Sequence, residues 1–282
     1  ANVNNNASFG NLSSIQSAGR YEIVTILSHT ESAGTPTSIT ISGSFTYAYN
    51  TGANSSVQVI SFPTLGSPDY TTVADISAKN WDGNTGGVVA LNVNGILTLA
   101  NNISADNAGF RGGAANSDNS SDNCNGVDYI ATSQNWFADK GEGIFKRTAA
   151  NQAAGKGKIL NGGGGSNSHN GGGGGGGNFS VGGNGGPGWS ASGDCDPSAG
   201  GLGGISLSTN IATSRIFMGG GGGSGEGNNG GSVDGGDGGG IVIIHANEIT
   251  TTGSCGPLTI TANGENVNIS TSSNDGGSGG GA

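Results

Sequence analysis

Large apolar side chains and charges are both scarce in this sequence. Hydrophobic residues make up 32% of the 282 positions, aromatic residues 6% and charged residues 10%. The low hydrophobic content argues against an ordinary oily core, and the low charge argues against the composition of most disordered chains. The composition therefore favours fibrous or solenoid order, in which backbone packs against backbone.

Basic residues are too few and too dispersed for a nucleic-acid-binding surface. The nine lysines and arginines are spread along a chain of net charge −10, whereas nucleic-acid binding requires a clustered basic patch. Apolar runs such as 241–244 are far too short to span a bilayer, so we expect no transmembrane segment. The small, polar start at Ala1 fits a mature secreted protein.

Cysteine and histidine are also rare, and their spacing matches no zinc pattern. Cys124, Cys195 and Cys255 leave one cysteine over if the other two form a disulfide. Matches to a dinucleotide fingerprint at 225–230 and to a nucleophile elbow at 276–280 are expected by chance in so much glycine. Both lack the strand-to-helix context that these motifs need. The sequence predicts no enzyme.

Helix-forming residues are rare, and β-branched residues dominate residues 1 to about 105. Strands are predicted at 21–27, 38–42 and 57–62. Two further units, 86–106 and 239–264, share a pattern of two glycines, a β-branched strand, a turn and a short Leu-Thr strand. Such repetition is typical of stacked, solenoid-like architectures.

Glycine is the residue in excess, at 61 positions. Its longest uninterrupted run is Gly171–Gly177, and large apolar residues such as Trp189 and Phe217 punctuate the runs at regular distances. A flexible linker would not carry such residues. We therefore predict an ordered array of polyglycine-II-type helices, with three residues per turn and hydrogen bonds between neighbours. The seven-glycine run should lie inside this array, and the segment 182–188 at its edge.

The predicted fold class is all-β plus a polyglycine-II-type helix array, a β-strand region followed by a glycine-rich, solenoid-like scaffold. Residues 1–79 form the β-rich N-terminal region. Residues 80–282 form the glycine-rich repeat scaffold, with a loop insertion at 107–154. The stretch 275–282 reads as the opening of another glycine segment, so we expect the scaffold to continue beyond residue 282 in a longer protein.

The insertion 107–154 concentrates aromatic and basic residues that the rest of the chain lacks. Long loops on rigid scaffolds often carry function, and aromatic and arginine side chains are typical of contact hot spots. Alternatively, the aromatic side chains fold back and cap the scaffold with a small core. The candidate binding residues are Tyr129, Trp136, Phe137, Lys140, Phe145, Lys146 and Arg147.

The same insertion contains an oxygen-rich stretch at 118–128. Its spacing does not fit an EF-hand, but Asp118, Asp122 and Asp128 are candidate ligands for a calcium ion. The simpler interpretation is a solvated loop rich in Asn and Asp. No other cofactor is predicted.

Three stretches together form a distinctive sequence pattern. They are Asn-Trp-Asp-Gly-Asn within 80–90, Ser-Ala-Asp-Asn-Ala-Gly within 103–113, and the polyglycine of 169–179. This combination resembles the glycine-rich N-terminal region of very large surface proteins that gliding Bacteroidota secrete through the type IX system, a group that includes gliding-motility adhesins. The polyglycine runs are also similar to those of phage tail-tip adhesins, in which loops between packed polyglycine helices bind a receptor. Neither resemblance implies a catalytic residue.

The resemblance implies a secreted, cell-surface adhesin or filament-tip module that binds through loops on a rigid polyglycine scaffold. The expected partners are other segments of the same large surface protein, secretion or outer-membrane proteins, or an external surface or glycan. One alternative is a structural spacer or cap of a larger extracellular fibre, without a ligand of its own. Another is an ice-binding protein, which would need a flat, regular face of threonine or small residues.

Overall fold

A computed structural model describes most of the chain, over residues 1–52, 55–115, 124–132, 137–190, 193–210, 215–227, 232–253, 258–267 and 278–282. In these ranges helix is confined to two 3-10 turns, η1 (Ala150–Gln152) and η2 (Ser208–Asn210). The described part of the chain has no helix that is long and apolar enough to cross a membrane. The remaining elements are short strands in small, open sheets. The coarse prediction of a largely β fold is confirmed.

An exposed hairpin stands out from the N-terminal third. β1 (Ile26–Ser32) pairs antiparallel with β2 (Thr35–Ile41), and Ala33 and Gly34 between them both have positive φ. Two such residues form the tight turn whose twist suits a hairpin. β2 agrees with the strand predicted at 38–42, whereas β1 begins at Ile26 rather than at residue 21.

The strand predicted at 57–62 is wrong. Those residues alternate β-branched and polar side chains, yet within the described ranges they pair with no strand, and Val59 is 71% exposed. Their anchor is the Gln58 side chain, which donates to the Gly86 carbonyl and accepts from the Gly86 N–H. Strand propensity reflects packing against neighbours, so it does not form a strand where no neighbour is present.

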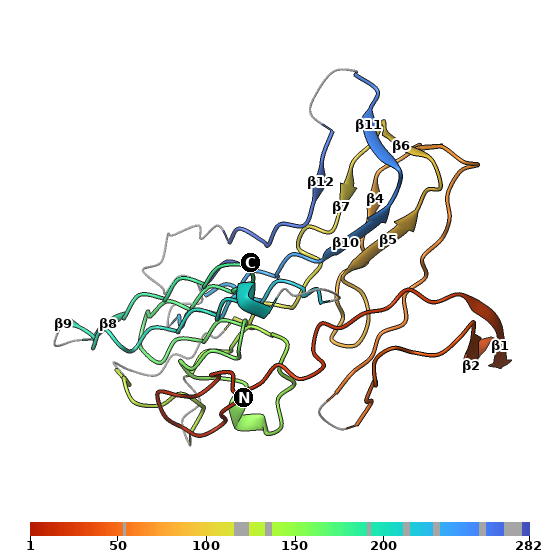
Figure 1. Cartoon of the computed structure of the whole chain (residues 1–282). Helices are drawn as coiled ribbons and strands as arrows, with labels where there is room; N and C mark the ends of the chain where they lie inside the picture. The colour runs from red at the N-terminus through yellow and green to blue at the C-terminus, as the bar shows by residue number, and fades with distance from the viewer. Residues whose placement is uncertain are drawn as a thin grey trace.

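Three passes of the chain stack as parallel strands, at the upper right of Figure 1. The middle pass contributes β5 (Val88–Asn92), β6 (Ile96–Leu99) and β7 (Ile103–Ser104). The last pass, with β10 (Ile241–His245), β11 (Glu248–Thr251) and β12 (Ile260–Thr261), pairs with it strand for strand. The first pass contributes β3 (Tyr70–Thr71) and β4 (Ile76–Ser77), which pair with β6 and β7 from the other side.

The stacking explains the repeat in the sequence. The two units with a shared pattern are the middle and last passes, with Val88 opposite Ile241 and Ile103 opposite Ile260. Alternate side chains of the middle pass point inward and form the main apolar core, which comprises Val89, Leu91, Val93, Leu97, Leu99 and Ile103. The two units that share a sequence pattern therefore lie side by side as paired parallel strands.

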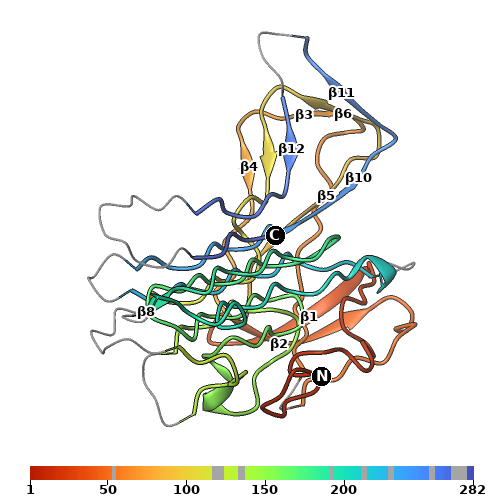
Figure 2. The same cartoon turned by 90° about the vertical axis from the view of Figure 1, so that its left-hand side faces the viewer.

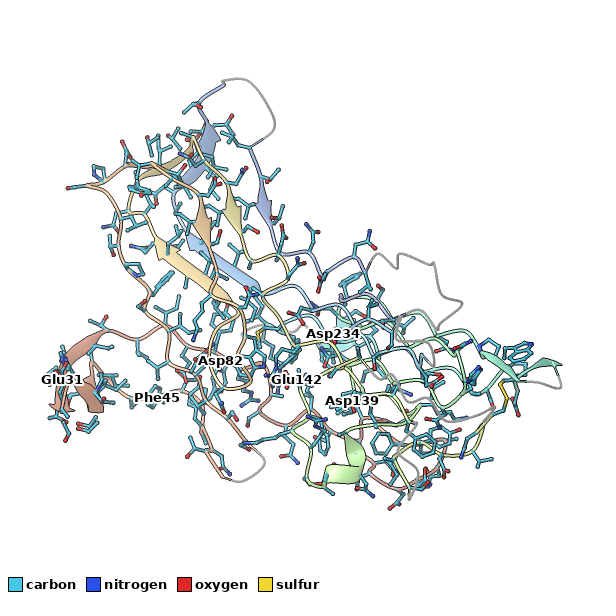
Figure 3. All side chains as sticks on the ribbon, turned by 180° about the vertical axis from the view of Figure 1, so that it is seen from behind. Glu31, Phe45, Asp82, Asp139, Glu142 and Asp234 are labelled. Carbon is cyan, nitrogen blue, oxygen red and sulfur yellow. A yellow bond between two sulfur atoms is a disulfide. The ribbon has the colours of Figure 1, made fainter. Side chains whose placement is uncertain are left out.

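The glycine-rich part of the chain runs back and forth beside these sheets, as Figures 1 and 2 show. Side chains are dense around the sheets and sparse along these segments (Figure 3). Backbone hydrogen bonds join each segment to others that are distant in sequence. The extended segments are 108–113, 138–143, 161–168, 171–178, 181–188, 199–207, 217–226, 234–240, 262–267 and 278–282.

The segment 217–226 shows the pairing rule most clearly. Its successive N–H groups donate to three different neighbours in turn, and the fourth returns to the first. Gly219 and Gly222 donate to segment 234–240, Gly220 and Gly223 donate to 171–178, and Gly221 and Ser224 donate to 138–143. Its carbonyls accept from three further segments: 108–113, 161–168 and 278–282. Hydrogen bonding thus repeats every three residues.

Burial within these segments agrees with the sequence prediction. The run Gly171–Gly177 is largely buried, whereas 182–188 is exposed or half-buried. Neither Gly164 nor Gly174 has a positive φ, but a Cβ at either would come within 3.0 Å of a neighbouring backbone carbonyl. Glycine is needed at these positions for close approach of chains rather than for an unusual backbone conformation.

A polar junction joins the sheets to the glycine segments. The Arg111 guanidinium donates to the Glu142 carboxylate at 2.6 Å, and the Trp81 indole N–H donates to the same carboxylate at 3.2 Å. Glu142 lies near the middle of the molecule in Figure 3. The hydrogen bond to this carboxylate raises the pKa of Arg111, so the guanidinium stays charged at any physiological pH.

Candidate functional site

The candidate site lies at the end of the glycine segments that is farthest from the parallel sheets. Because the segments alternate in direction, every second connection returns to this end. The antiparallel strands β8 (Trp189–Ser190) and β9 (Gly193–Asp194) mark it at the left of Figure 1. We call this region the tip, and it comprises residues 124–132, 166–170, 187–190, 193–199 and 224–227.

Covalent and hydrogen bonds hold the tip loops together. A disulfide joins Cys124 to Cys195 across a sequence separation of 71 residues. Asn167 bridges the same two loops, because its carbonyl accepts from the Asn125 N–H and its own N–H donates to the Ala199 carbonyl, each at 3.1 Å. The structure thus pairs two of the three cysteines, a possibility that the sequence left open, while Cys255 lies outside the described residues.

A buried lysine, Lys156, holds two of the tip loops together. Lys156 is 1% exposed, and its ammonium group donates to the Ser198 carbonyl at 2.8 Å and to the Gly126 carbonyl. It also lies 4.7 Å from the centre of the Tyr129 ring. One side chain thus fastens both disulfide-linked loops, since a buried cation needs several acceptors to offset its desolvation.

The surface of the tip is aromatic and polar. Trp189 is 47% exposed, and its backbone N–H donates to the His169 carbonyl at 2.9 Å. The centroids of the Trp189 and His169 rings are 6.0 Å apart. Beneath them the Glu226 carboxylate is 1% exposed and accepts from the Asn170 N–H at 2.7 Å. Within the described ranges, no three His, Cys, Asp or Glu side chains form a potential metal site. The aromatic and polar groups of the tip can bind a partner by stacking and hydrogen bonding.

The predicted binding residues of the insertion divide into two groups. Phe137 and Lys140 are only 4% and 3% exposed, and Tyr129 is half-buried. The Lys140 ammonium donates to the carbonyls of Tyr129 at 2.5 Å and Gly155 at 2.7 Å, and it lies 4.9 Å from the Phe9 ring centre. The Phe137 and Lys140 side chains fold back under the tip, an arrangement that the capping alternative predicted, and binding by these residues stays a prediction.

The other predicted residues lie elsewhere. Phe145 is half-buried, and Lys146 and Arg147 are exposed, on the turn that precedes η1. The neighbouring Ile144 N–H donates to the Asn161 side chain, which lies toward the sheet end of its segment. Phe145, Lys146 and Arg147 thus lie on a separate turn from Tyr129, although Arg147 is near enough to Lys140 to lower its pKa. Trp136 lies outside the described residues.

The structure describes one of the three predicted calcium ligands, Asp128. Both carboxylate oxygens of Asp128 accept amide N–H groups, from Asn5 and Asn125, each at 2.7 Å. Asp118 and Asp122 lie outside the described residues. Asp128 is thus occupied in stabilising the loop, and calcium binding stays a prediction.

Replacing Lys140 by Met should flatten the pH dependence of stability. Burial lowers the pKa of Lys140 well below its ordinary value, as does the nearby Arg147, while Asp139 raises it. The unfolded chain then binds more protons than the folded chain between the depressed pKa and about 10.5, so stability rises with pH in that window. We expect the melting temperature to rise more between pH 7 and 9.5 in the parent than in Lys140→Met.

The control for this prediction is Lys146→Met, which removes an exposed lysine of the same insertion. It should keep the pH slope of the parent protein. Equal slopes in all three proteins would contradict a buried, pKa-depressed Lys140.

Several tip residues were not anticipated from the sequence. Trp189, His169 and the loop 193–199 lie outside the insertion that was predicted to carry the site. The signal was present, however, because glycine segments of similar length that reverse direction must return alternate loops to one end. Taken together, the fold and the tip define a largely β, glycine-rich protein with disulfide-linked loops at one end. No protein-family model, curated protein or solved structure matches this chain.

Proposed function

We propose that this protein is a secreted, non-catalytic module of the cell surface, an adhesin or filament-tip module that binds through its tip. The observation that carries the proposal is the assembly of sequence-distant loops around an exposed Trp189, joined by the Cys124–Cys195 disulfide. Trp residues flanked by polar groups are the commonest anchors of binding surfaces. A disulfide between loops also suits an oxidising, extracellular environment.

The proposal includes a polyglycine-II-type array as the rigid support of the tip, and a small solenoid-like stack of strands as its base. The three-residue period of hydrogen bonding in 217–226 supports this assignment, since polyglycine II has three residues per turn. Six hydrogen-bonded neighbours around that segment also fit a hexagonal packing. Such a support holds the loops without a hydrophobic core.

The partner that best fits the tip is an uncharged surface or glycan. The chain carries a net charge of −10, which disfavours association with polyanionic partners. The exposed Trp189 ring and the Asn and Ser groups around it suit a ligand with apolar faces and hydroxyl groups. By resemblance, the protein would belong to the type IX-secreted, gliding-motility class of surface proteins.

Replacing Trp189 by Ala should abolish attachment without loss of stability. The ring is about half exposed, so its removal costs little folding free energy, whereas loss of a hot-spot Trp costs 2 kcal/mol or more of binding, roughly thirtyfold. Attachment of the purified protein to a glycan array or to candidate cell surfaces measures this effect, together with the melting temperature.

Phe179→Ala is the matched control. Phe179 is 74% exposed and lies at the opposite end of the array, where its carbonyl accepts from the Ser206 hydroxyl. Attachment that survives both substitutions would contradict recognition by the tip. No attachment by the unsubstituted protein would favour the structural spacer or cap of an extracellular fibre.

Ice binding has one observation in its favour. Thr71, Thr98 and Thr250 lie in register across β3, β6 and β11. Ser77, Ser104 and Thr261 form a second row across β4, β7 and β12. Each row is only three residues deep, so the tip carries the main proposal.

A further inference from the structure

An open groove runs along one side of the glycine array. Three segments line it: Gly175 and Gly176 from the first, residues 180–184 from the second, and residues 279–282 from the third. Its volume is about 470 Å³. Seven of the eleven lining residues are glycine, so the groove exposes mostly backbone rather than an apolar surface.

The groove occupies a vacant position in the packing around segment 171–178. This segment pairs with five described neighbours: 161–168, 181–188, 199–207, 217–226 and 278–282. Hydrogen bonds also link these neighbours in sequence around it, from 278–282 through 217–226, 161–168 and 199–207 to 181–188. Between 278–282 and 181–188 the structure gives no such link. The sixth position therefore lies between these two segments, where the groove is.

Each wall presents an unpaired backbone group. The Gly175 N–H donates to the Gly183 carbonyl, and the Gly176 N–H donates to the Gly280 carbonyl. Among the described residues, nothing pairs with the Gly176 carbonyl or with the N–H groups of Gly183 and Gly280. In segment 217–226, groups at equivalent places bond to the six surrounding segments. One further extended chain in the groove would satisfy all three walls.

We propose that this groove is the docking site for one extended, glycine-rich segment of a partner chain. The inference rests on the polyglycine-II-type array of the proposed function. The bound segment donates to the Gly176 carbonyl and accepts from the N–H groups of Gly183 and Gly280, with the same three-residue period. About six residues, roughly 19 Å at about 3.1 Å per residue, cover two periods.

The walls select for glycine. Interior glycines of the array sit so close to neighbouring carbonyls that a Cβ would come within 3.0 Å, as at Gly173 and Gly223. A segment that fills the vacant position would lie equally close to the backbones of the three segments that line the groove. A partner with side chains on those sides would be excluded, so sequence selectivity arises from the absence of Cβ atoms.

A synthetic peptide tests the proposal with the protein as it exists. The probe is acetyl-Lys-(Gly)6-Lys-amide, and its matched control carries Ala in place of each Gly. Binding of a flexible glycine peptide is weakened by its ordering entropy, so millimolar peptide is used and the backbone amide resonances are followed by NMR. We expect saturable shifts and slowed hydrogen exchange at Gly183 and Gly280 with the glycine peptide only.

Gly175→Ala is the blocking variant. A Cβ at Gly175 meets its nearest neighbours at 3.4–3.7 Å and points toward Gly183 and Gly280, so it fills the groove without disturbing the fold. It should weaken peptide binding at least tenfold, whereas Gly52→Ala, in an exposed loop, should not. Equal binding by both variants, or by both peptides, would overturn the proposal.

Two further outcomes separate the alternatives. Concentration-dependent dimerisation by sedimentation, with the same amide shifts in the absence of peptide, would assign the groove to a second copy and overturn the partner-segment proposal. Attachment through Trp189 is measured independently of the groove. Lost peptide binding with normal attachment in Gly175→Ala would support the groove while the tip function stands. Peptide binding without any attachment would leave the groove standing and remove the tip function.

Discussion

Gly174→Ala is expected to destabilise the protein severely, whereas Gly175→Ala, one residue later in the same run, is expected to leave it nearly unchanged. A Cβ at Gly174 would lie within 3.0 Å of the Leu202 carbonyl, a backbone group that cannot rotate away. At Gly175 the nearest atoms are 3.4 Å or more away, an ordinary van der Waals contact. We expect a loss of about 3 kcal/mol or more at Gly174, from overpacking and from hydrogen bonds broken as the chains separate.

Gly183→Ala extends the series to the edge of the array. A Cβ there would meet no atom within 4 Å, and its φ is not in the positive region. Alanine also reduces the entropy of the unfolded chain, so this variant should be stabilised by about 0.4–1 kcal/mol. Chemical denaturation of the three variants gives the free energies of unfolding. Equal, small effects at all three positions would mean that the run is a flexible linker.

Removing the Cys124–Cys195 disulfide is expected to have the second large effect. The bond closes a loop with a sequence separation of 71 residues, for which the chain-entropy model predicts about 4 kcal/mol of stabilisation. It also fixes two loops of the tip, which share few apolar contacts. The double variant with both cysteines replaced by Ser should therefore unfold at a lower temperature and lose attachment.

Reducing agent provides the control for the disulfide. It should lower the melting temperature of the parent protein to that of the double-serine variant and leave the variant itself unchanged. If reduction and substitution both left the melting temperature unaltered, Lys156 and the backbone hydrogen bonds would be sufficient to hold the tip, and the disulfide would not be a stabilising element.

Burial of the lysines illustrates where sequence reasoning was insufficient. Lys140 was predicted as a binding residue because the insertion 107–154 concentrates aromatic and basic residues. In the fold its ammonium group reaches two carbonyls, of Tyr129 and Gly155, that come from separate loops. No local pattern predicts such an arrangement, because the acceptors meet only after the chain has folded.

Composition and repetition by themselves determined much of this protein. They predicted a largely β chain, the repeated strand units at 86–106 and 239–264, and the burial of Gly171–Gly177. These features depend on residue type and short spacing: β-branched side chains favour strands, and only glycine allows backbones to approach closely on every side.

The tertiary structure alone decided which segments are neighbours. It brought Trp189 beside His169 at the tip and buried Lys140. Among the described residues, it gave 57–62 no partner strand and left one position beside segment 171–178 open. The physical reason is the same in each case. Glycine is the commonest residue in many of the array segments, so their local sequences do not specify which segments pair. Their order is therefore set by loop lengths, the disulfide and the sheets at the base, which act between residues far apart in the chain.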